Sequence, residues 1–153
     1  MGKRLSESLR LPFVDLDREI EVKEGTTISD LLTRKGESYF RTVESTLLKL
    51  KAASQEDFVM ATGGGAPCFH DGMKIINENG LSVYLDVPLP TLFNRTNSSG
   101  RPLLESDDRQ ARLRSLFERR ASIYQQAHLT YNEEAGDTFE VLVADLIKKL
   151  SHT

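Results

Sequence analysis

The sequence predicts an α/β protein in which helices cover both faces of a parallel β-sheet. Short apolar runs of strand length alternate along the chain with amphipathic helical patterns, which is typical of parallel sheets. Polar and glycine-rich segments follow two of the predicted strands, and α/β proteins bind ligands beyond the carboxyl ends of their strands. The 153 residues contain no repeat or linker, so we expect one domain spanning residues 1–153.

The predicted elements follow in a regular order. Leu5 and Leu9 have helical spacing, and this helix runs into Leu11-Pro12 without a capping residue at its start. Strands are predicted at the compact apolar runs, residues 13–17, 58–62 and 81–85. Helical patterns occupy residues 27–35, 37–53, 71–79 and 90–95, and Gly36 and Gly80 are suited to end two of them.

Several helices show a clear apolar face. In the helix after Gly36 the apolar residues recur three or four apart, at Phe40, Val43, Leu47 and Leu50. A long helix is indicated by Leu113, Leu116, Phe117 and Ile123. The last helix has an apolar face made of Phe139, Leu142, Val143, Leu146, Ile147 and Leu150. The polar residues 96–100 have no apolar period and are predicted to form an exposed loop.

Composition excludes several classes of protein. Lys and Arg number 20 against 23 Asp and Glu, and a net charge of −3 argues against a nucleic-acid binder held mainly by phosphate contacts. The single cysteine, Cys68, allows neither an intrachain disulfide nor a cysteine-based metal site. No apolar stretch approaches the ~20 residues of a membrane span, and no signal peptide is recognisable. We expect a cytoplasmic, monomeric protein that does not bind membranes.

The first candidate site residues are Asp15 and Asp17, at the end of the first predicted strand. Their spacing of two places both side chains on one face of a strand end. A carboxylate there can accept a proton from a hydroxyl group or hold a water molecule on Mg²⁺. The alternative is that Asp17 caps the following helix.

The glycine run Gly63-Gly64-Gly65 follows the second predicted strand. It lets a ligand approach backbone N–H groups, although a simple turn is the alternative, and no Walker A motif follows it.

Arg41 and Glu44 have the spacing of a surface ion pair on a helix. Arg101 is suited to a phosphate clamp on a closing loop but equally to a solvated loop position.

Three further features have ordinary structural interpretations when each is considered alone. Taken alone, the basic pair Arg119-Arg120 is a solvated part of a helix. His70 and His128 lack metal-ligand spacing and are predicted to be structural, and Cys68 is predicted to be a small packed side chain.

Five motifs together resemble the shikimate kinase family along nearly the whole chain. In family order they are F-V-D-L-D-R-E-I-E from residue 13, G-E-S-Y-F-R-T-V-E from 36, A-T-G-G-G-A from 61, R-P-L-L from 101 and R-R-A-S-I-Y from 119. The resemblance implies a three-layer P-loop kinase fold, similar to nucleoside monophosphate kinases, with a five-stranded parallel sheet. It also implies transfer of the γ-phosphoryl group of ATP to the 3-hydroxyl of shikimate, with Mg²⁺, in aromatic amino-acid biosynthesis.

The same resemblance implies roles for individual residues. Asp17 would bind shikimate hydroxyls and act as general base, and Asp15 would help to hold Mg²⁺ through water. Arg41 and Arg120 would bind the shikimate carboxylate, with Glu44 orienting the arginines. The glycines that would line the shikimate pocket are Gly63, Gly64 and Gly65. Arg101 would reach the transferring phosphate from a lid at about residues 96–108, and Arg95 would lie near the nucleotide.

The sequence departs from the family at its start, because the opening strand and its G-x-x-x-x-G-K-[ST] loop have no counterpart in these 153 residues. Residues 1–5 match the segment just after that loop. We expect a shikimate kinase whose true N-terminus lies upstream of Met1, and a chain that is inactive in phosphoryl transfer as written. The alternatives are a non-catalytic shikimate-binding protein and a related small-molecule kinase such as a gluconate kinase.

Overall fold

The computed structural model describes residues 1–92 and 106–151, apart from the side chains of residues 106–110 and 133. The chain divides into two compact units, residues 1–81 and 82–153. Among the described residues each unit contains one pair of parallel strands, which confirms the predicted parallel pairing. No helix in the described ranges is both long enough and apolar enough to cross a membrane.

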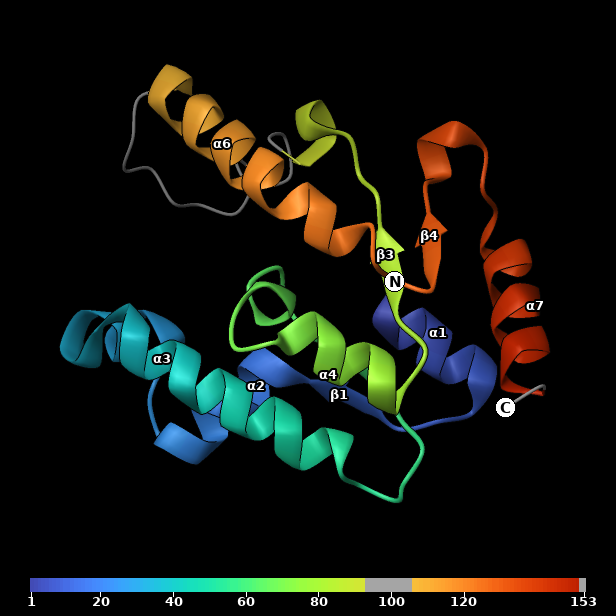
Figure 1. Ribbon diagram of the computed structural model, residues 1–153, viewed down its shortest axis with the longest axis horizontal. Coiled ribbons are helices and arrows are strands. Elements are labelled where there is room, and N and C mark those ends of the chain that lie inside the picture. Colours follow the sequence, from blue (N-terminus) through green and yellow to red (C-terminus); the bar gives the residue numbers. More distant parts are fainter. Residues whose placement is uncertain (93–105, 152–153) are drawn as a thin grey trace. The chain divides into compact units, whose positions relative to one another are not determined.

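The first unit is built around two parallel strands and the helices that connect them (Figure 1). Its elements are α1 (Gly2–Leu9), β1 (Phe13–Asp15), α2 (Leu16–Glu24), α3 (Ile28–Ala52), β2 (Val59–Ala61), the 3₁₀ helix η1 (Ala66–Cys68) and α4 (Gly72–Asn79). Phe13 lies opposite Val59 and Asp15 opposite Ala61, so the carboxyl ends of β1 and β2 meet. Helices α2 and α3 form the crossover that a parallel pair requires.

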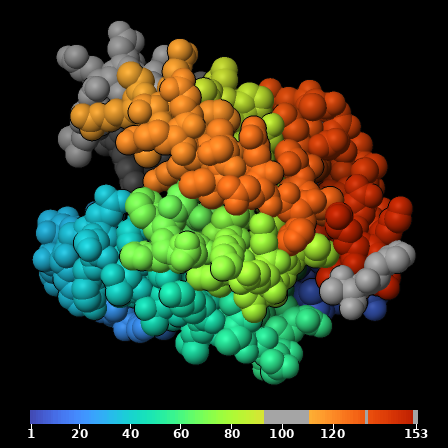
Figure 2. Space-filling model, in the orientation of Figure 1, coloured from blue at the N-terminus to red at the C-terminus, as the bar shows by residue number. Residues whose placement is uncertain are grey.

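Helix α3 consists of two helical segments joined at Gly36. The backbone there has φ 80° and ψ 170°, values open to glycine and strained for other residues, so the predicted break is confirmed. The first segment is capped by Thr27, whose Oγ1 accepts a hydrogen bond from the backbone N–H of Asp30 at 3.1 Å. The second segment contacts α4, and Figure 2 shows their side chains packed together in the first unit.

The core of the first unit is formed mainly by α2 and α3, and Met60 of β2 and Ile75 and Ile76 of α4 pack against it. Its buried members are Leu16, Ile20, Leu31, Phe40, Val43, Leu47, Leu48 and Ala66. The predicted apolar face of α3 is correct for Phe40, Val43 and Leu47 but wrong for Leu50, which is 65% exposed. Leu50 lies near the end of the helix, where Leu48 packs into the core instead. The nine-residue helix α2 was missed because its apolar residues, Leu16 and Ile20, stand among charged side chains.

The second unit contains the other parallel pair, with Val83 opposite Leu129 and Leu85 opposite Tyr131. Its elements are β3 (Val83–Leu85), a helical stretch at residues 89–92, α6 (Ser106–Tyr124), β4 (Leu129–Tyr131), the 3₁₀ helix η2 (Glu133–Ala135) and α7 (Phe139–Leu150). Strand β4 was not predicted. Of the predicted helix at 90–95, residues 93–95 lie outside the described part of the chain. The same holds for residues 96–105 of the predicted lid, whereas residues 106–108 begin α6.

Helix α7 begins and packs as its sequence indicates, but its apolar face is narrower than predicted. The Thr138 side chain caps the helix by accepting a hydrogen bond from the backbone N–H of Val141. Phe139, Leu142 and Leu146 are buried, whereas Ile147 and Leu150 are each about half exposed. The side chains that this helix buries are therefore in its first two turns, and the apolar residues near its end are exposed.

Candidate active site

The carboxyl ends of β1 and β2 bring an aspartate and a glycine turn together. Asp17 lies in the first turn of α2, and a Cβ atom placed on Gly63 would lie 3.6 Å and 3.7 Å from its carboxylate oxygens. Gly63 has φ +69°, a conformation that side-chain-bearing residues rarely adopt. The predicted convergence of Asp17 and the glycine run is therefore present, and it follows from the register of the strand pair.

The predicted geometry of the two aspartates is wrong in one respect. Strand β1 ends at Asp15, so Asp15 and Asp17 do not leave one face of a strand. Asp15 is the residue that caps α2, because its Oδ1 accepts hydrogen bonds from the backbone N–H groups of Asp17 at 3.1 Å and Arg18 at 3.4 Å. The capping role considered for Asp17 belongs to Asp15, and this leaves the Asp17 carboxylate facing the glycine turn.

The environment of Asp17 makes its carboxylate a stronger base than an ordinary aspartate. Although the residue reaches solvent, partial burial raises the pKa of Asp17, and the negative charges of Asp15 and Glu21 raise it further. The positive charge of Arg41 acts in the opposite direction and lowers the pKa. Asp17 and Arg41 are therefore electrostatically coupled.

Arg41 projects from α3 into a set of close contacts. Its Nη1 donates a hydrogen bond to Glu44 Oε2 at 2.8 Å, and its Nε and Nη2 donate to Glu37 Oε1 at 3.3 Å and 3.2 Å. The Arg41 side chain is only 14% exposed and that of Glu44 only 4%. The interpretation of Arg41 and Glu44 as a surface ion pair is therefore wrong, and the two residues form a shielded, charge-assisted contact.

Aromatic rings and a glycine complete the surroundings of Arg41. Its guanidinium carbon lies 4.9 Å from the ring centre of Phe40 and 4.4 Å from that of Phe69. A Cβ atom on Gly65 would overlap the guanidinium group, with Cζ at 2.8 Å and Nη2 at 2.9 Å. Gly65 therefore allows Arg41 to lie directly against the glycine turn, and the glycine run is more than a simple turn.

Glu37 and Phe69 were missed as members of this site. Glu37 precedes Arg41 by four residues and Glu44 follows it by three, so all three lie on one face of the helix. That charged stripe was the available signal for Glu37. Phe69 had no such signal, because it meets Arg41 through the path of the chain after the glycine turn.

The other predicted site residues lie outside the group formed by Asp17, Arg41 and the glycine turn, or have few described contacts. Arg95 and Arg101 lie outside the described residues. Arg120 lies on α6 in the second unit and is half-buried, whereas its neighbour Arg119 is exposed. The carbonyl oxygen of Gly64 accepts a weak hydrogen bond from Cys68 Sγ at 3.7 Å.

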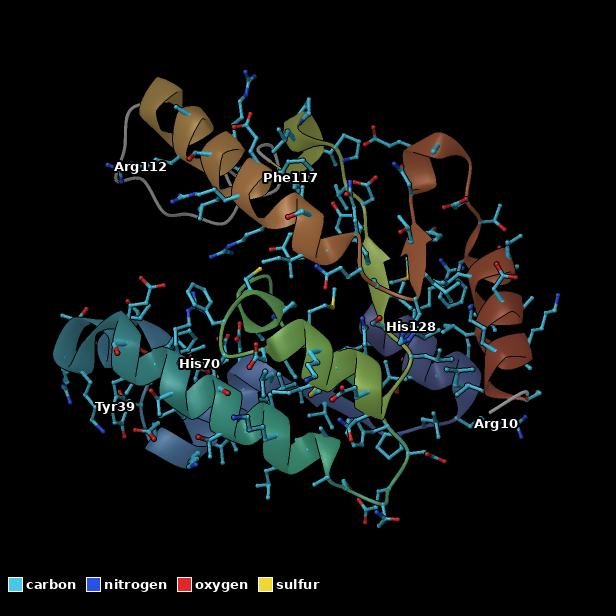
Figure 3. All side chains as sticks on the ribbon, in the orientation of Figure 1. Arg10, Tyr39, His70, Arg112, Phe117 and His128 are labelled. Atoms are coloured by element: carbon cyan, nitrogen blue, oxygen red, sulfur yellow. The ribbon has the colours of Figure 1, made fainter. Side chains whose placement is uncertain are left out.

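His128 and His70 both occupy structural positions, one at the start of a strand pair and the other in a turn. His128 and Ser82 hold the start of the β3–β4 pair, since the His128 backbone N–H donates to Ser82 Oγ at 2.9 Å. Figure 3 labels His128, and also His70 in the turn before α4, where φ is 51°.

Within the described residues, no group of three or more Asp, Glu, His or Cys side chains is arranged to hold a metal ion. Asp15 alone cannot bind Mg²⁺ without water and a second ligand source.

The ends of β3 and β4 carry a polar cluster that was not predicted. Tyr84 stacks on Tyr124 with ring centres 5.3 Å apart and donates a hydrogen bond to Asp86 at 3.1 Å. Burial and the Asp86 carboxylate raise the pKa of Tyr84 to about 12. The Asn132 side chain donates to the other Asp86 oxygen at 3.4 Å, which ties the two strand ends together. This cluster serves the packing of the second unit.

Comparison with known proteins gives a consistent result. The family model described as shikimate kinase matches residues 1–151. A shikimate kinase of Persephonella marina is 37% identical over 143 residues, which cover 93% of this chain and 85% of that relative. One of a Sulfurihydrogenibium species is 37% identical over 149 residues, covering 97% of this chain and 88% of the relative.

Solved structures agree with the sequence relatives. The crystal structure of shikimate kinase from Bacteroides thetaiotaomicron has a TM-score of 0.81 and 34% identity, covering 99% of this chain and 88% of that one. The Acinetobacter baumannii shikimate kinase in complex with shikimate has a TM-score of 0.77 and 34% identity, and the match covers 97% of this chain and 81% of that one. The predicted α/β fold with parallel strands is confirmed by these likenesses.

Proposed function

Because this chain belongs to the shikimate kinase family, we propose that Asp17, Arg41 and the glycine turn form its shikimate-binding site. The observation that carries the proposal is the convergence of an aspartate and a shielded arginine on Gly63–Gly65. A carboxylate that accepts hydrogen bonds and a guanidinium that donates them match the hydroxyl and carboxylate groups of shikimate.

Asp17 is the proposed general base. It would accept the proton of the shikimate 3-hydroxyl as that oxygen attacks the phosphoryl group. Its raised pKa strengthens it as a proton acceptor, and the neighbouring Asp15 and Glu21 charges contribute to that effect. Asp15 fixes the start of α2 and so fixes the position of Asp17.

Arg41 is the proposed ligand of the shikimate carboxylate. Contacts with two phenyl rings and the short bond to Glu44 hold the guanidinium plane before any ligand arrives. Preorganisation of this kind reduces the entropy lost on binding. Gly63, Gly64 and Gly65 would allow the ring of shikimate to approach the backbone. Arg120 on α6 stays a predicted second arginine for the same carboxylate.

The phosphoryl donor implied by the family is ATP with Mg²⁺. When bound, it supplies the γ-phosphoryl group, and the metal neutralises charge on the transferring oxygens. Asp15 is the proposed Mg²⁺ ligand, acting through water, as the family implies. Its Oδ1 already accepts hydrogen bonds from two backbone N–H groups, so Oδ2 is the oxygen left for that water. Arg101 and Arg95 are the proposed contacts to phosphate and nucleotide. The 153 residues contain no G-x-x-x-x-G-K-[ST] motif, so binding and turnover need separate tests.

Calorimetric titration with shikimate tests the acceptor site. The chain is expected to bind shikimate, and Arg41→Lys is expected to weaken binding by about tenfold or more, because an ammonium cannot form the bidentate contact. Arg34→Lys, an exposed arginine on the same helix, is the matched control and should bind as the wild type does.

Two results would contradict the proposal. One is equal shikimate affinity in the Arg41→Lys and wild-type chains. The other is tighter binding of gluconate than of shikimate, which would favour a different sugar-acid kinase. Release of ADP in the presence of ATP, Mg²⁺ and shikimate then reports phosphoryl transfer, independently of acceptor binding.

A further inference from the structure

Arg41 is shared between two carboxylates that differ greatly in burial. The bond from Nη1 to Glu44 is short, at 2.8 Å, and the Glu44 side chain is 4% exposed. The bonds from Nε and Nη2 to Glu37 are longer, at 3.3 Å and 3.2 Å, and the Glu37 side chain is 65% exposed. The inner contact is shielded from water, whereas the outer one is solvated and weak.

The outer contact uses the part of Arg41 that is best suited to a carboxylate ligand. The Nε–H and one Nη2–H point to the same side of the guanidinium and form a two-pronged donor for a carboxylate. In the structure, Oε1 of Glu37 accepts both bonds. A ligand carboxylate that approaches this edge therefore meets an acceptor that is already in place.

We propose that Glu37 is a resident competitor for the carboxylate-binding edge of Arg41, and that a bound substrate carboxylate displaces it. This inference rests on the proposed function, because it requires Arg41 to bind the carboxylate of shikimate. Glu37 acts through Arg41 and is therefore a positioning residue.

The charge balance around Arg41 favours exchange over simple addition. Arg41 already pairs with Glu37 and Glu44, and the nearby charge of Asp17 also acts on it, so within the first unit carboxylates outnumber this guanidinium. A fourth carboxylate would be repelled if all three stayed in place. Departure of Glu37 lets the ligand take over its two hydrogen bonds without changing the charge next to Arg41.

Local structure makes Glu37 the partner that can leave. It directly follows the break at Gly36 and opens the second helical segment of α3, where a carboxylate interacts favourably with the helix N-terminus after release. Arg41 meanwhile remains held by the buried Glu44 and by contact with the rings of Phe40 and Phe69. The exchange therefore leaves the guanidinium in its binding orientation.

Removal of the competitor should strengthen binding. Glu37→Gln is expected to lower the shikimate Kd by roughly two- to fivefold, because exposed ion pairs of this spacing are weak. The matched control is Glu19→Gln, which removes one charge from the same unit at a partly exposed glutamate paired with Lys51 at 2.9 Å. The control should leave the Kd unchanged. An unchanged or higher Kd for Glu37→Gln, or the same gain in both variants, overturns the proposal.

A second measurement separates this inference from the proposed function. The Arg41 Nε–H signal in nuclear magnetic resonance, recorded without ligand, should exchange with water faster in Glu37→Ala than in the wild type and Glu19→Gln chains. Equal exchange in all three overturns the Glu37 contact, whether or not shikimate binds. If the exchange differs as expected but shikimate binds to none of them, the proposed function fails and the competition with shikimate fails with it.

Discussion

Gly65→Ala tests whether close contact between the glycine turn and Arg41 creates the site. The backbone of Gly65 has φ −89° and ψ −41°, which alanine adopts without strain, so the effect of the added methyl group is purely steric. The new Cβ would lie 2.8 Å from Arg41 Cζ, whereas ordinary contacts begin at 3.4 Å. Arg41 Nη1 is the nearest atom and would be overlapped even more closely, so the guanidinium must retreat by more than about 0.6 Å, the difference between these two distances.

The expected magnitude follows from the contacts that this retreat disturbs. The charge-assisted bond from Arg41 to Glu44 at 2.8 Å is of a kind that contributes about 1.5–3 kcal/mol. Loss of comparable bonds to a bound carboxylate corresponds to a roughly ten- to hundredfold higher shikimate Kd. The free energy of unfolding should fall by only about 1–2 kcal/mol, because the arginine side chain can bend away but leaves a buried glutamate poorly paired.

Calorimetry with shikimate and urea unfolding measure the two effects separately. Gly80→Ala is the matched control, since a Cβ there would lie 3.9 Å from its nearest neighbour, the Ile76 carbonyl oxygen, and the backbone is extended. The control should change neither quantity appreciably. If Gly65→Ala binds shikimate as tightly as Gly80→Ala does, then the position of Arg41 against the turn is irrelevant to binding and the reasoning fails.

Two further predictions concern charge and backbone strain. Asp17→Asn should unfold at a higher urea concentration than the wild type at pH 7, because burial and nearby carboxylates raise the pKa of Asp17 and so disfavour its charged form in the folded chain. Below pH 3.8, the ordinary pKa, Asp17 is protonated and neutral, so the folded wild type has no unfavourable charge there. The wild type loses stability as the pH rises through the raised pKa, so the urea midpoints of the two chains should converge in acid. Equal midpoints at pH 7 would contradict this. Gly36→Ala should lower the free energy of unfolding by about 1–3 kcal/mol, since φ 80° and ψ 170° are strained for alanine. Urea unfolding checks it against Gly80→Ala, and equal stability of the two variants would show that the kink relaxes at no cost.

Prediction from sequence succeeded where the signal was local and long. The helix after Gly36 and the last helix have apolar residues at helical spacing over several turns, and both are present. Prediction failed for the short elements α2 and β4. The three residues of β4 become a strand because they pair with β3, more than 40 residues earlier in the chain, and no local pattern encodes that partner.

The residues of the candidate site could also be identified from the sequence. Asp17, Arg41 and the glycine run were identified from residue type and order alone, since motifs carry those properties along the chain. Their roles remain proposals. Glu37 had a signal in its spacing from Arg41, but Phe69 had none, because its contact with Arg41 arises only after the chain has turned.

The sequence by itself determined the family, the α/β pattern and the residue types at the ends of β1 and β2. Only the tertiary structure decided that Asp15 caps α2 and that Asp17 faces Gly63. It also decided that Arg41 is shielded, lies against two aromatic rings and is shared by an inner and an outer glutamate. The physical reason is that burial, pKa and the sharing of one guanidinium depend on distances between segments far apart in the chain, and residue spacing along one element cannot specify them.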